Sequence, residues 1–158
     1  MRTNNQCSMA LHMLIVIDIF KWKKMTSEKI AKSVGCDSSI IRALLGKLQK
    51  AEIVKTQRGS GGTELLLPPE EITVWKVYSA VDSAELSNIF GLHPHPFPEC
   101  PIGRNIHAAL SLPYDRVREA IRAEMQTITL KDLIDECANS EGVSMEEFIE
   151  ICRKVTTI

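Results

Sequence analysis

The pattern of apolar and polar residues predicts two short helices in the first third of the chain. The first is expected over residues 27–34, with Thr26 as its N-cap and Gly35 just past its end. The second is expected to open at Asp37, another N-cap residue type, and to run to about Ala51. The connection between them is too short for anything except two helices that pack at a steep angle. The pattern therefore predicts a helix-turn-helix.

A glycine-rich segment separates two runs of strand-forming residues directly after these helices. The runs cover residues 53–57 and 63–67, and Arg58-Gly59-Ser60-Gly61-Gly62 lies between them. Strand, glycine turn and strand predict a β-hairpin with Arg58 at its tip. A helix-turn-helix followed by such a hairpin is typical of a DNA-binding winged helix. We therefore expect a mainly α fold with a small β-hairpin wing, and we assign residues 1–67 to a winged helix-turn-helix DNA-binding domain.

The distribution of charge supports a nucleic-acid partner for this first domain. The whole chain carries a net charge of −1, which taken alone argues against such a partner. Residues 1–67, however, hold 11 Lys and Arg against 5 Asp and Glu, whereas residues 68–158 hold 8 against 15. A basic N-terminal domain can meet phosphate while the acidic remainder stays away from it. The alternative is that these basic residues merely solvate a surface.

Apolar content and cysteine usage favour a cytoplasmic location. The apolar run Leu11–Phe20 is short and is followed by Lys21, Lys23 and Lys24, so we interpret it as a buried first helix rather than a signal peptide or a membrane span. The chain has 5 cysteines without regular spacing, which does not resemble a secreted disulfide framework. We expect no contact with a membrane.

The second half of the chain predicts a connecting segment, a long helix and two short ones. A helix is expected to begin at residues 68–71, and a proline-rich loop follows, so residues 68–101 form a connection. Apolar residues then keep helical spacing over residues 102–128, where Pro113 should kink or divide the helix. Residues 129–158 should form two short C-terminal helices, over residues 130–138 and 145–155.

A long helix with a single apolar stripe needs a partner, and the simplest is its own copy in a second subunit. We therefore assign residues 102–128 to a dimerisation helix, although the stripe could instead pack within one chain. Two-fold pairing would set the two reading helices about 34 Å apart, one turn of duplex DNA, and would favour a palindromic operator.

Several motifs together point to a known family. They are Ala10-Leu11-His12-Met13-Leu14, residues 30–48, Arg58-Gly59-Ser60-Gly61-Gly62 with residues 65–69, residues 72–82, Cys100-Pro101-Ile102-Gly103-Arg104-Asn105-Ile106 and Thr129-Leu130-Lys131-Asp132-Leu133. On these motifs, residues 8–138 resemble the Rrf-two family of bacterial winged-helix regulators. The resemblance implies a homodimeric transcription factor, usually a repressor, that dimerises through the long helix. It also implies a reading helix in the major groove and a wing-tip arginine in the minor groove.

The resemblance assigns DNA contacts to Ser38, Ser39 and Arg42 of the reading helix and to Arg58 of the wing. The full set of expected contacts also includes Lys47, Gly59 and Ser60.

Two positions depart from the family. Members that bind an iron–sulfur cluster carry three cysteines in the loop before the long helix, and this loop holds only Cys100, so we expect no cofactor. Some members have an acidic residue in place of Arg42, so the operator sequence does not transfer.

Three hypotheses remain for the signal to which such a regulator would respond, and the first is a thiol switch. Cys36 lies in the turn before the reading helix, near a helix N-terminus that lowers a thiol pKa. A disulfide between Cys36 and Cys100, within or across subunits, would tie the reading helix to the dimer element. Alternatively, Cys36 only fills the turn. We interpret Cys137 and Cys152 as core thiols.

The other two hypotheses concern ligands of the proline-rich loop. A metal or cofactor could use the imidazole and thiolate ligands of the loop and the following helix, which are His93, His95, Cys100 and His107. Their spacing matches no standard site. A small molecule could instead lie against aromatic side chains, for which the candidates are Trp75, Tyr78, Phe97 and Tyr114.

Functions of other classes are less well supported. Cys100 with a neighbouring histidine could be the nucleophile and base of a thiol enzyme, but no acidic residue at fixed spacing would orient that histidine. The winged helix could also serve only as a protein-interaction scaffold. We therefore expect a transcriptional regulator and no enzyme.

Overall fold

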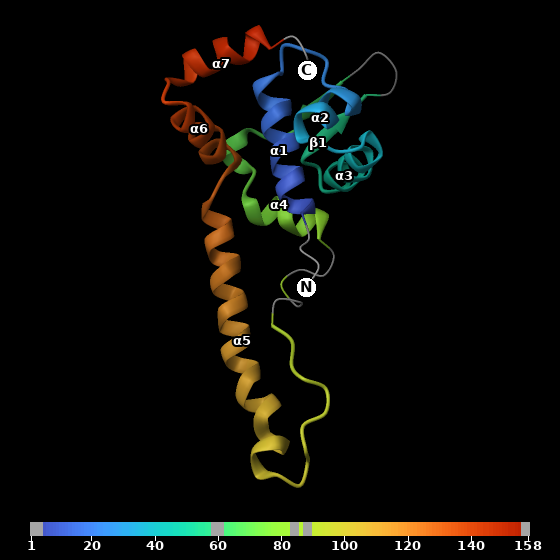
Figure 1. The fold of residues 1–158 in the computed structure, drawn as a ribbon, viewed down its shortest axis with the longest axis vertical. Coiled ribbons are helices and arrows are strands. Elements are labelled where there is room, and N and C mark those ends of the chain that lie inside the picture. Colours follow the sequence, from blue (N-terminus) through green and yellow to red (C-terminus); the bar gives the residue numbers. More distant parts are fainter. Residues whose placement is uncertain (1–4, 58–61, 83–85, 87–89, 156–158) are drawn as a thin grey trace.

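The computed structural model describes residues 5–57, 62–82, 86 and 90–155. It divides into a helical head and a long arm (Figure 1). The head contains α1 (Gln6–Ile19), α2 (Ser27–Val34), α3 (Ser38–Lys50), β1 (Val54–Thr56), β2 (Thr63–Leu65), the 3-10 turn η1 (Pro69–Glu71), α4 (Val74–Val81), α6 (Leu130–Glu141) and α7 (Met145–Lys154). The arm is α5 (Pro101–Thr127) with the extended segment that leads into it.

Helix α1 lies at the centre of the head, in agreement with the buried first helix that its apolar run predicted. Met13, Leu14 and Ile17 are fully buried, and α1 contacts α2, α3, α4, α6 and β2. A helix that is apolar over most of its surface needs neighbours on several sides. Burial of such side chains supplies most of the free energy that holds a head of this kind together. The short apolar run is therefore a core helix.

The helix-turn-helix forms as predicted, and its local interactions explain its bounds. The Thr26 hydroxyl accepts a hydrogen bond from the backbone N–H of Lys29 at the start of α2. Gly35 ends α2 with a φ of 74°, in the left-handed region that favours glycine. The Asp37 carboxylate accepts a hydrogen bond of 2.7 Å from the N–H of Ser39 and so caps α3. Each boundary is thus fixed by a residue of the expected type.

The wing is a two-stranded antiparallel hairpin that also contacts the loop between α1 and α2. Val54 pairs with Leu65 and Thr56 with Thr63. The N–H of Thr63 donates a hydrogen bond of 3.0 Å to the carbonyl of Met25. The wing is therefore attached to the loop before α2 as well as to α3. The predicted tip residues Arg58, Gly59 and Ser60 lie outside the described residues.

The expectation of a helix beginning at residues 68–71 is wrong. Residues 69–71 form a 3-10 turn, and α4 begins only at Val74, after Thr73 as its N-cap. The intervening residues are extended because Thr73 forms an isolated antiparallel bridge with Thr129. The N–H of Leu130 donates to the carbonyl of Ile72 at 2.7 Å. This short ladder fixes the exit of the arm to the head.

Helix α5 is a single helix that Pro113 does not divide, contrary to one of the two expected outcomes. Proline removes one backbone donor from the helix interior, and α5 keeps its helical assignment through this position. Its last turns contact α4, and the guanidinium of Arg122 lies 4.8 Å from the ring centroid of Trp75. None of its residues is buried in the single chain.

Helices α6 and α7 form the two predicted C-terminal helices. Both begin with a capping box, Thr129 with Asp132 and Ser144 with Glu147. Helix α6 continues to Glu141, three residues past its expected end, and Gly142 closes it with a φ of 72°. Within the described part of the chain, none of the helices has the length and apolar composition needed to cross a membrane.

Candidate nucleic-acid interface

The exposed face of α3 begins at its N-terminus. Ile41, Leu44 and Leu48 are buried against the head, whereas Ser39 and Arg42 point into solvent with Ile40 40% exposed. Ser38 is half-buried. The helix thus presents short polar side chains and one guanidinium beside its N-terminus, which Asp37 caps. That combination suits a surface rich in oxygen acceptors, because the helix end and the guanidinium both attract anions.

Arg42 already has a partner in the free protein. Its guanidinium lies 3.2 Å from the carboxylate of Glu28 on α2, and both side chains are largely exposed. Hydrogen bonds from the Glu28 backbone N–H and the Thr26 side chain, with a smaller contribution from Arg42, lower the pKa of Glu28. No sequence pattern indicates this pair directly, because the two residues are 14 positions apart on different helices.

The side chain of Lys47 lies against the head, whereas those of Ser39 and Arg42 are exposed. Its ammonium donates to the carbonyl of Val81 at 2.6 Å and to the side-chain oxygen of Gln6 at 2.7 Å. Both partners belong to the head, and Val81 supplies one of the carbonyls that the end of α4 leaves without a helical partner. Lys47 therefore joins α3 to α1 and α4, and we leave it out of the candidate interface.

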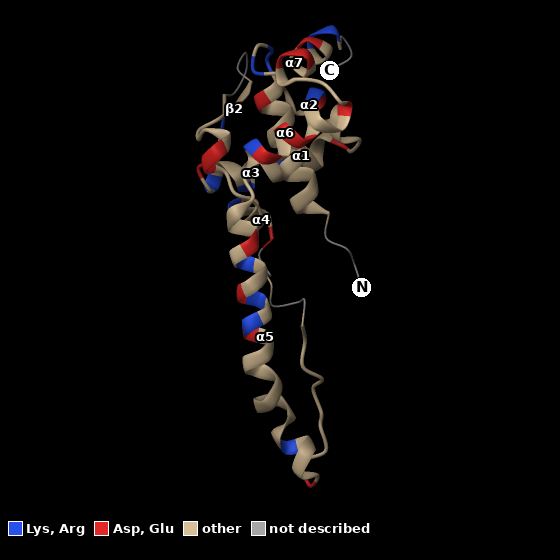
Figure 2. Cartoon of the chain, turned by 90° about the vertical axis from the view of Figure 1, so that its left-hand side faces the viewer, with Lys and Arg blue, Asp and Glu red and all other residues tan. Residues whose placement is uncertain are grey.

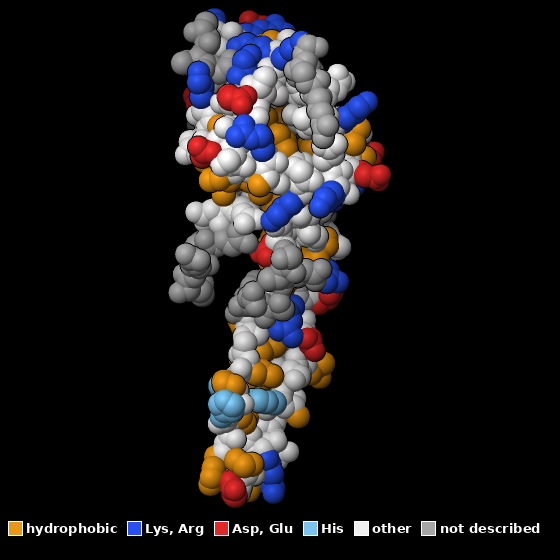
Figure 3. Space-filling view, turned by 90° about the vertical axis from the view of Figure 1, so that its right-hand side faces the viewer, with side chains coloured by type: hydrophobic (Ala, Val, Ile, Leu, Met, Phe, Trp, Pro, Cys, Tyr) orange, Lys and Arg blue, Asp and Glu red, His pale blue; other side chains and the backbone are white. Residues whose placement is uncertain are grey.

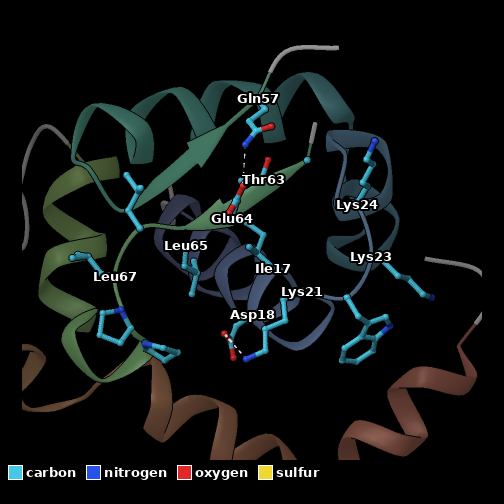
Figure 4. A pocket seen from close by; sticks show the side chains of 15 residues that line it. Ile17, Asp18, Lys21, Lys23, Lys24, Gln57, Thr63, Glu64, Leu65 and Leu67 are labelled. Atoms are coloured by element: carbon cyan, nitrogen blue, oxygen red, sulfur yellow. Dashed lines mark hydrogen bonds and ion pairs between the residues drawn. The ribbon is translucent and has the colours of Figure 1, made fainter. Parts of the chain in front are cut away.

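A cleft of about 860 Å³ lies beside the wing. The loop between α1 and α2 forms one wall, with Lys21, Lys23 and Lys24, and the strand β2 forms another (Figure 4). Lys21 lies 3.7 Å from Asp18, and Gln57 donates to Glu64 at 3.2 Å. The sequence indicated these lysines only as an argument against a signal peptide, because their position beside the wing depends on the tertiary fold.

The structure excludes a disulfide between Cys36 and Cys100 of the same chain in this conformation. Cys36 is half-buried between α2 and α3 and packs against the core. Cys100 is the N-cap of α5, at the end of the arm that points away from the head (Figure 1). A helix of 27 residues is about 40 Å long, whereas disulfide-bonded Cα atoms lie about 6 Å apart. Only the pairing between subunits stays a prediction.

The surroundings of Cys100 favour its thiolate. Hydrogen bonds from the backbone N–H groups of Gly103 and then Ile102 lower the pKa of Cys100 below its usual value. Burial has the opposite effect elsewhere: it raises the pKa of Cys7, Cys137 and Cys152. The helix N-terminus thus favours the thiolate at Cys100.

The histidines of the arm come together only in part. His107 contacts His93, with ring centroids 5.5 Å apart and Nε2 of His107 2.8 Å from the His93 carbonyl. Among the residues that the structure describes, no three His, Cys, Asp or Glu side chains are arranged to hold a metal ion. His95 and Cys100 therefore do not complete a ligand set with the other two.

The aromatic side chains proposed as walls of a small-molecule site fall into separate groups. Trp75 and Tyr78 contact each other on α4, with centroids 5.7 Å apart, whereas Tyr114 contacts Phe90 at 5.4 Å. Phe97 is 67% exposed. These contacts are those of packed pairs, and they do not favour one shared site.

The comparison with protein families matches residues 3–136 to Rrf2, described as an iron-dependent transcriptional regulator. This range covers both the head up to α6 and the arm. The chain belongs to the Rrf2 family. The match confirms the resemblance to the Rrf-two regulators that the sequence motifs indicated, and the winged-helix fold agrees with it.

Individual relatives agree with this assignment. The chain is 33% identical over 132 residues to YwnA of Bacillus subtilis (strain 168), a proposed HTH-type transcriptional regulator, which covers 84% of this chain and 96% of that protein. It is also similar to a crystal structure of a proposed DNA-binding protein, with 29% identity and a TM-score of 0.66 over 82% of this chain and 98% of the other. The fold of CymR, the global cysteine regulator of B. subtilis, matches with a TM-score of 0.64 at 20% identity, over 86% of this chain and 98% of that one.

The iron dependence in the family description does not fit the thiols of this chain. Cys100 is the only cysteine of the segment that leads into α5. The other four lie on α1, in the helix-turn-helix connection, on α6 and on α7. Iron–sulfur clusters take most of their ligands from neighbouring thiolates, and the segment before α5 supplies one.

Proposed function

We propose that the protein is a homodimeric, DNA-binding transcriptional repressor that contacts a palindromic operator with the N-terminal turns of α3 and with the wing. The observation that carries the proposal is the exposed start of α3, where Ser39 and Arg42 lie outside the core and Arg42 lines the same hollow as the wing residues Thr56 and Thr63. Within this proposal Ser38, Ser39 and Arg42 meet the major groove. The wing residues Arg58, Gly59 and Ser60 meet the minor groove.

Dimerisation through α5 is supported by the apolar side chains that the single chain leaves uncovered. Ile102 is 73% exposed, Leu112 68% and Val117 41%. Charged residues gather on the half of α5 nearest the head, and the outer half is almost free of them (Figure 2). An uncharged helix surface of this size in water favours burial against a second copy.

The proposal is tested by fluorescence anisotropy of the purified protein on DNA from upstream of its own gene. We expect saturable binding that Arg42→Ala weakens roughly tenfold, since a good arginine–guanine contact contributes about 1–3 kcal/mol. Sedimentation equilibrium gives the subunit number in the same buffer. Binding by Arg42→Ala that equals the wild type would contradict the assignment of α3, and a monomer would contradict the assignment of α5.

For the signal, we propose that oxidants act on the thiol of Cys100. The lowered pKa of Cys100 and its position at the start of α5 support this role, because oxidation follows thiolate character. The partner thiol would be Cys36 of the other subunit. The test compares reduced and peroxide-treated protein on non-reducing gels and on DNA, with Cys36→Ser and Cys100→Ser. Reversible loss of DNA binding without a covalent dimer would retain Cys100 and discard the pairing.

A further inference from the structure

The loop between α1 and α2 is attached to the wing by its backbone. Besides the hydrogen bond from Thr63 to Met25, a Cβ atom at Gly62 would lie 3.0 Å from the backbone nitrogen of Met25 and 3.3 Å from the Cα of Lys24. Only glycine allows the two backbones to approach this closely without a shift. The lysines of the loop are therefore held at the flank of the wing.

The end of α7 joins this loop from the other side. The guanidinium of Arg153 lies 5.3 Å from the ring centroid of Trp22, a cation–π contact. The ammonium of Lys23 donates a hydrogen bond of 2.8 Å to the carbonyl of Val155. Helix α7 begins at Met145, beyond the residues 3–136 that match the family. This chain thus adds an element beyond the matched range to the flank of the wing.

The two elements together form a surface that we name the basic shoulder. Its residues are Lys21, Lys23, Lys24, Arg153 and Lys154. Two acidic side chains offset it in part, since Asp18 pairs with Lys21 and Glu150 with Arg153 at 2.6 Å. Lys24 and Lys154 are exposed, and neither forms an ion pair within the described ranges of the chain. The shoulder therefore keeps positive charge available to an anionic partner.

The shoulder lies at the end of the molecule opposite the arm. Figure 1 shows the α1–α2 connection and the end of α7 at the top of the head, while α5 extends downward. On the face that carries the wing and α3, basic side chains gather toward this upper end (Figure 3). In a dimer that pairs through α5, the shoulders of the two subunits would be the outermost parts of the head.

We infer that the basic shoulder binds the phosphate groups of duplex DNA that flanks the operator, outside the segment that α3 and the wing contact. This inference rests on the proposed DNA-binding function and extends its footprint. Phosphate contacts of this kind add affinity that does not depend on sequence. The charge and outward position of the shoulder support the inference, together with its attachment to the wing.

The test uses two duplexes, one that ends at the operator and one with about ten further base pairs on each side. Fluorescence anisotropy over a range of salt concentrations gives the affinity and its salt dependence for each. The variants are Lys24→Ala and Lys154→Ala. The control is Lys131→Ala, which removes the same charge from a site surrounded by Asp135, Glu70 and Asp132.

We expect the wild type and Lys131→Ala to bind the long duplex several-fold more tightly than the short one. Each shoulder variant should lose part of that preference, and its salt slope on the long duplex should fall by about one for each phosphate that it no longer neutralises. Equal preference and slope in all four proteins would overturn the inference and leave the proposed function intact. No DNA binding by the wild type would overturn both.

Discussion

The guanidinium of Arg42 lies 3.2 Å from the carboxylate of Glu28, so an ion pair spans the two helices of the helix-turn-helix at its exposed surface. Exposed pairs of this kind contribute about 0–1 kcal/mol to folding. The pair has a larger consequence for binding, because an arginine that meets DNA must first leave Glu28. The free protein therefore holds its main candidate contact in a neutralised state.

Replacement of Glu28 by Gln should increase DNA affinity. The substitution releases Arg42 and removes a negative charge that lies close to the proposed phosphate backbone, so we expect binding about two- to tenfold tighter. Fluorescence anisotropy at low salt measures the change. Glu70→Gln is the matched control, since Glu70 lies on η1 near Lys131 and away from α3. Weaker binding by Glu28→Gln would show that Glu28 orients Arg42 for DNA.

Replacement of Gly35 by alanine should destabilise the helix-turn-helix. Its φ of 74° lies in the left-handed region, where a Cβ costs about 1 kcal/mol. Gly46 is the matched control, because it lies within α3 with nothing within 4 Å of its Cβ position. There, alanine should stabilise by up to about 1 kcal/mol. Urea unfolding of Gly35→Ala and Gly46→Ala should show opposite shifts, and equal shifts would contradict the argument.

These glycines also indicate how far the sequence determines the fold. The helix-turn-helix was predictable because its boundaries depend on local chemistry: Thr26 and Asp37 cap the helices, and Gly35 ends one of them. The start of α4 could not be predicted in this way. The extended residues before it depend on a bridge between Thr73 and Thr129, which are far apart in sequence.

The candidate interface shows the same division between local and long-range determinants. The exposure of Arg42 has a local cause, because helical periodicity sets which face of α3 is buried, whereas its assignment as a DNA contact came from the family resemblance and stays a prediction. The direction of the Lys47 side chain could not be predicted from the sequence, because it depends on the end of α4 lying beside α3. The Arg42–Glu28 pair and the approach of α7 to Trp22 likewise depend on tertiary packing.

The cysteines should differ in reactivity in a defined order. Iodoacetamide reacts with thiolates, so Cys100, whose pKa is lowered by backbone N–H groups, should be alkylated first near neutral pH. Cys7, Cys137 and Cys152 should follow more slowly, because burial raises the pKa of each. Mass spectrometry of peptides after short pulses measures the order. Faster labelling of Cys137 or Cys152 than of Cys100 would contradict it.

Stability should fall on acidification through the helix caps. Hydrogen bonds from Ser39, Thr129 and Ser144 lower the pKa values of Asp37, Asp132 and Glu147, respectively, in the folded protein. A lowered folded-state pKa stabilises the fold above the unfolded value of about 4, and the contribution is lost as the pH falls through the folded-state value. Urea midpoints between pH 7 and pH 2.5 should therefore decrease. The decrease should be smaller in Asp132→Asn, and an unchanged profile in that variant would contradict the role of the cap.

Substitution of Lys47 should change mainly the stability of the protein, and substitution of Arg42 should change mainly its affinity for DNA. Lys47→Met keeps the aliphatic stem but removes the ammonium that donates to Val81 and Gln6, so a part-buried carbonyl loses its donor. Loss of hydrogen bonds to a charged group costs about 1–3 kcal/mol. Urea unfolding should therefore detect Lys47→Met clearly, whereas anisotropy on folded protein should find its affinity close to that of the wild type. Arg42→Ala should behave in the opposite way, with near-normal stability and weakened binding. A large loss of affinity in folded Lys47→Met would return Lys47 to the DNA-contacting surface and would mean that its ammonium leaves Val81 on binding.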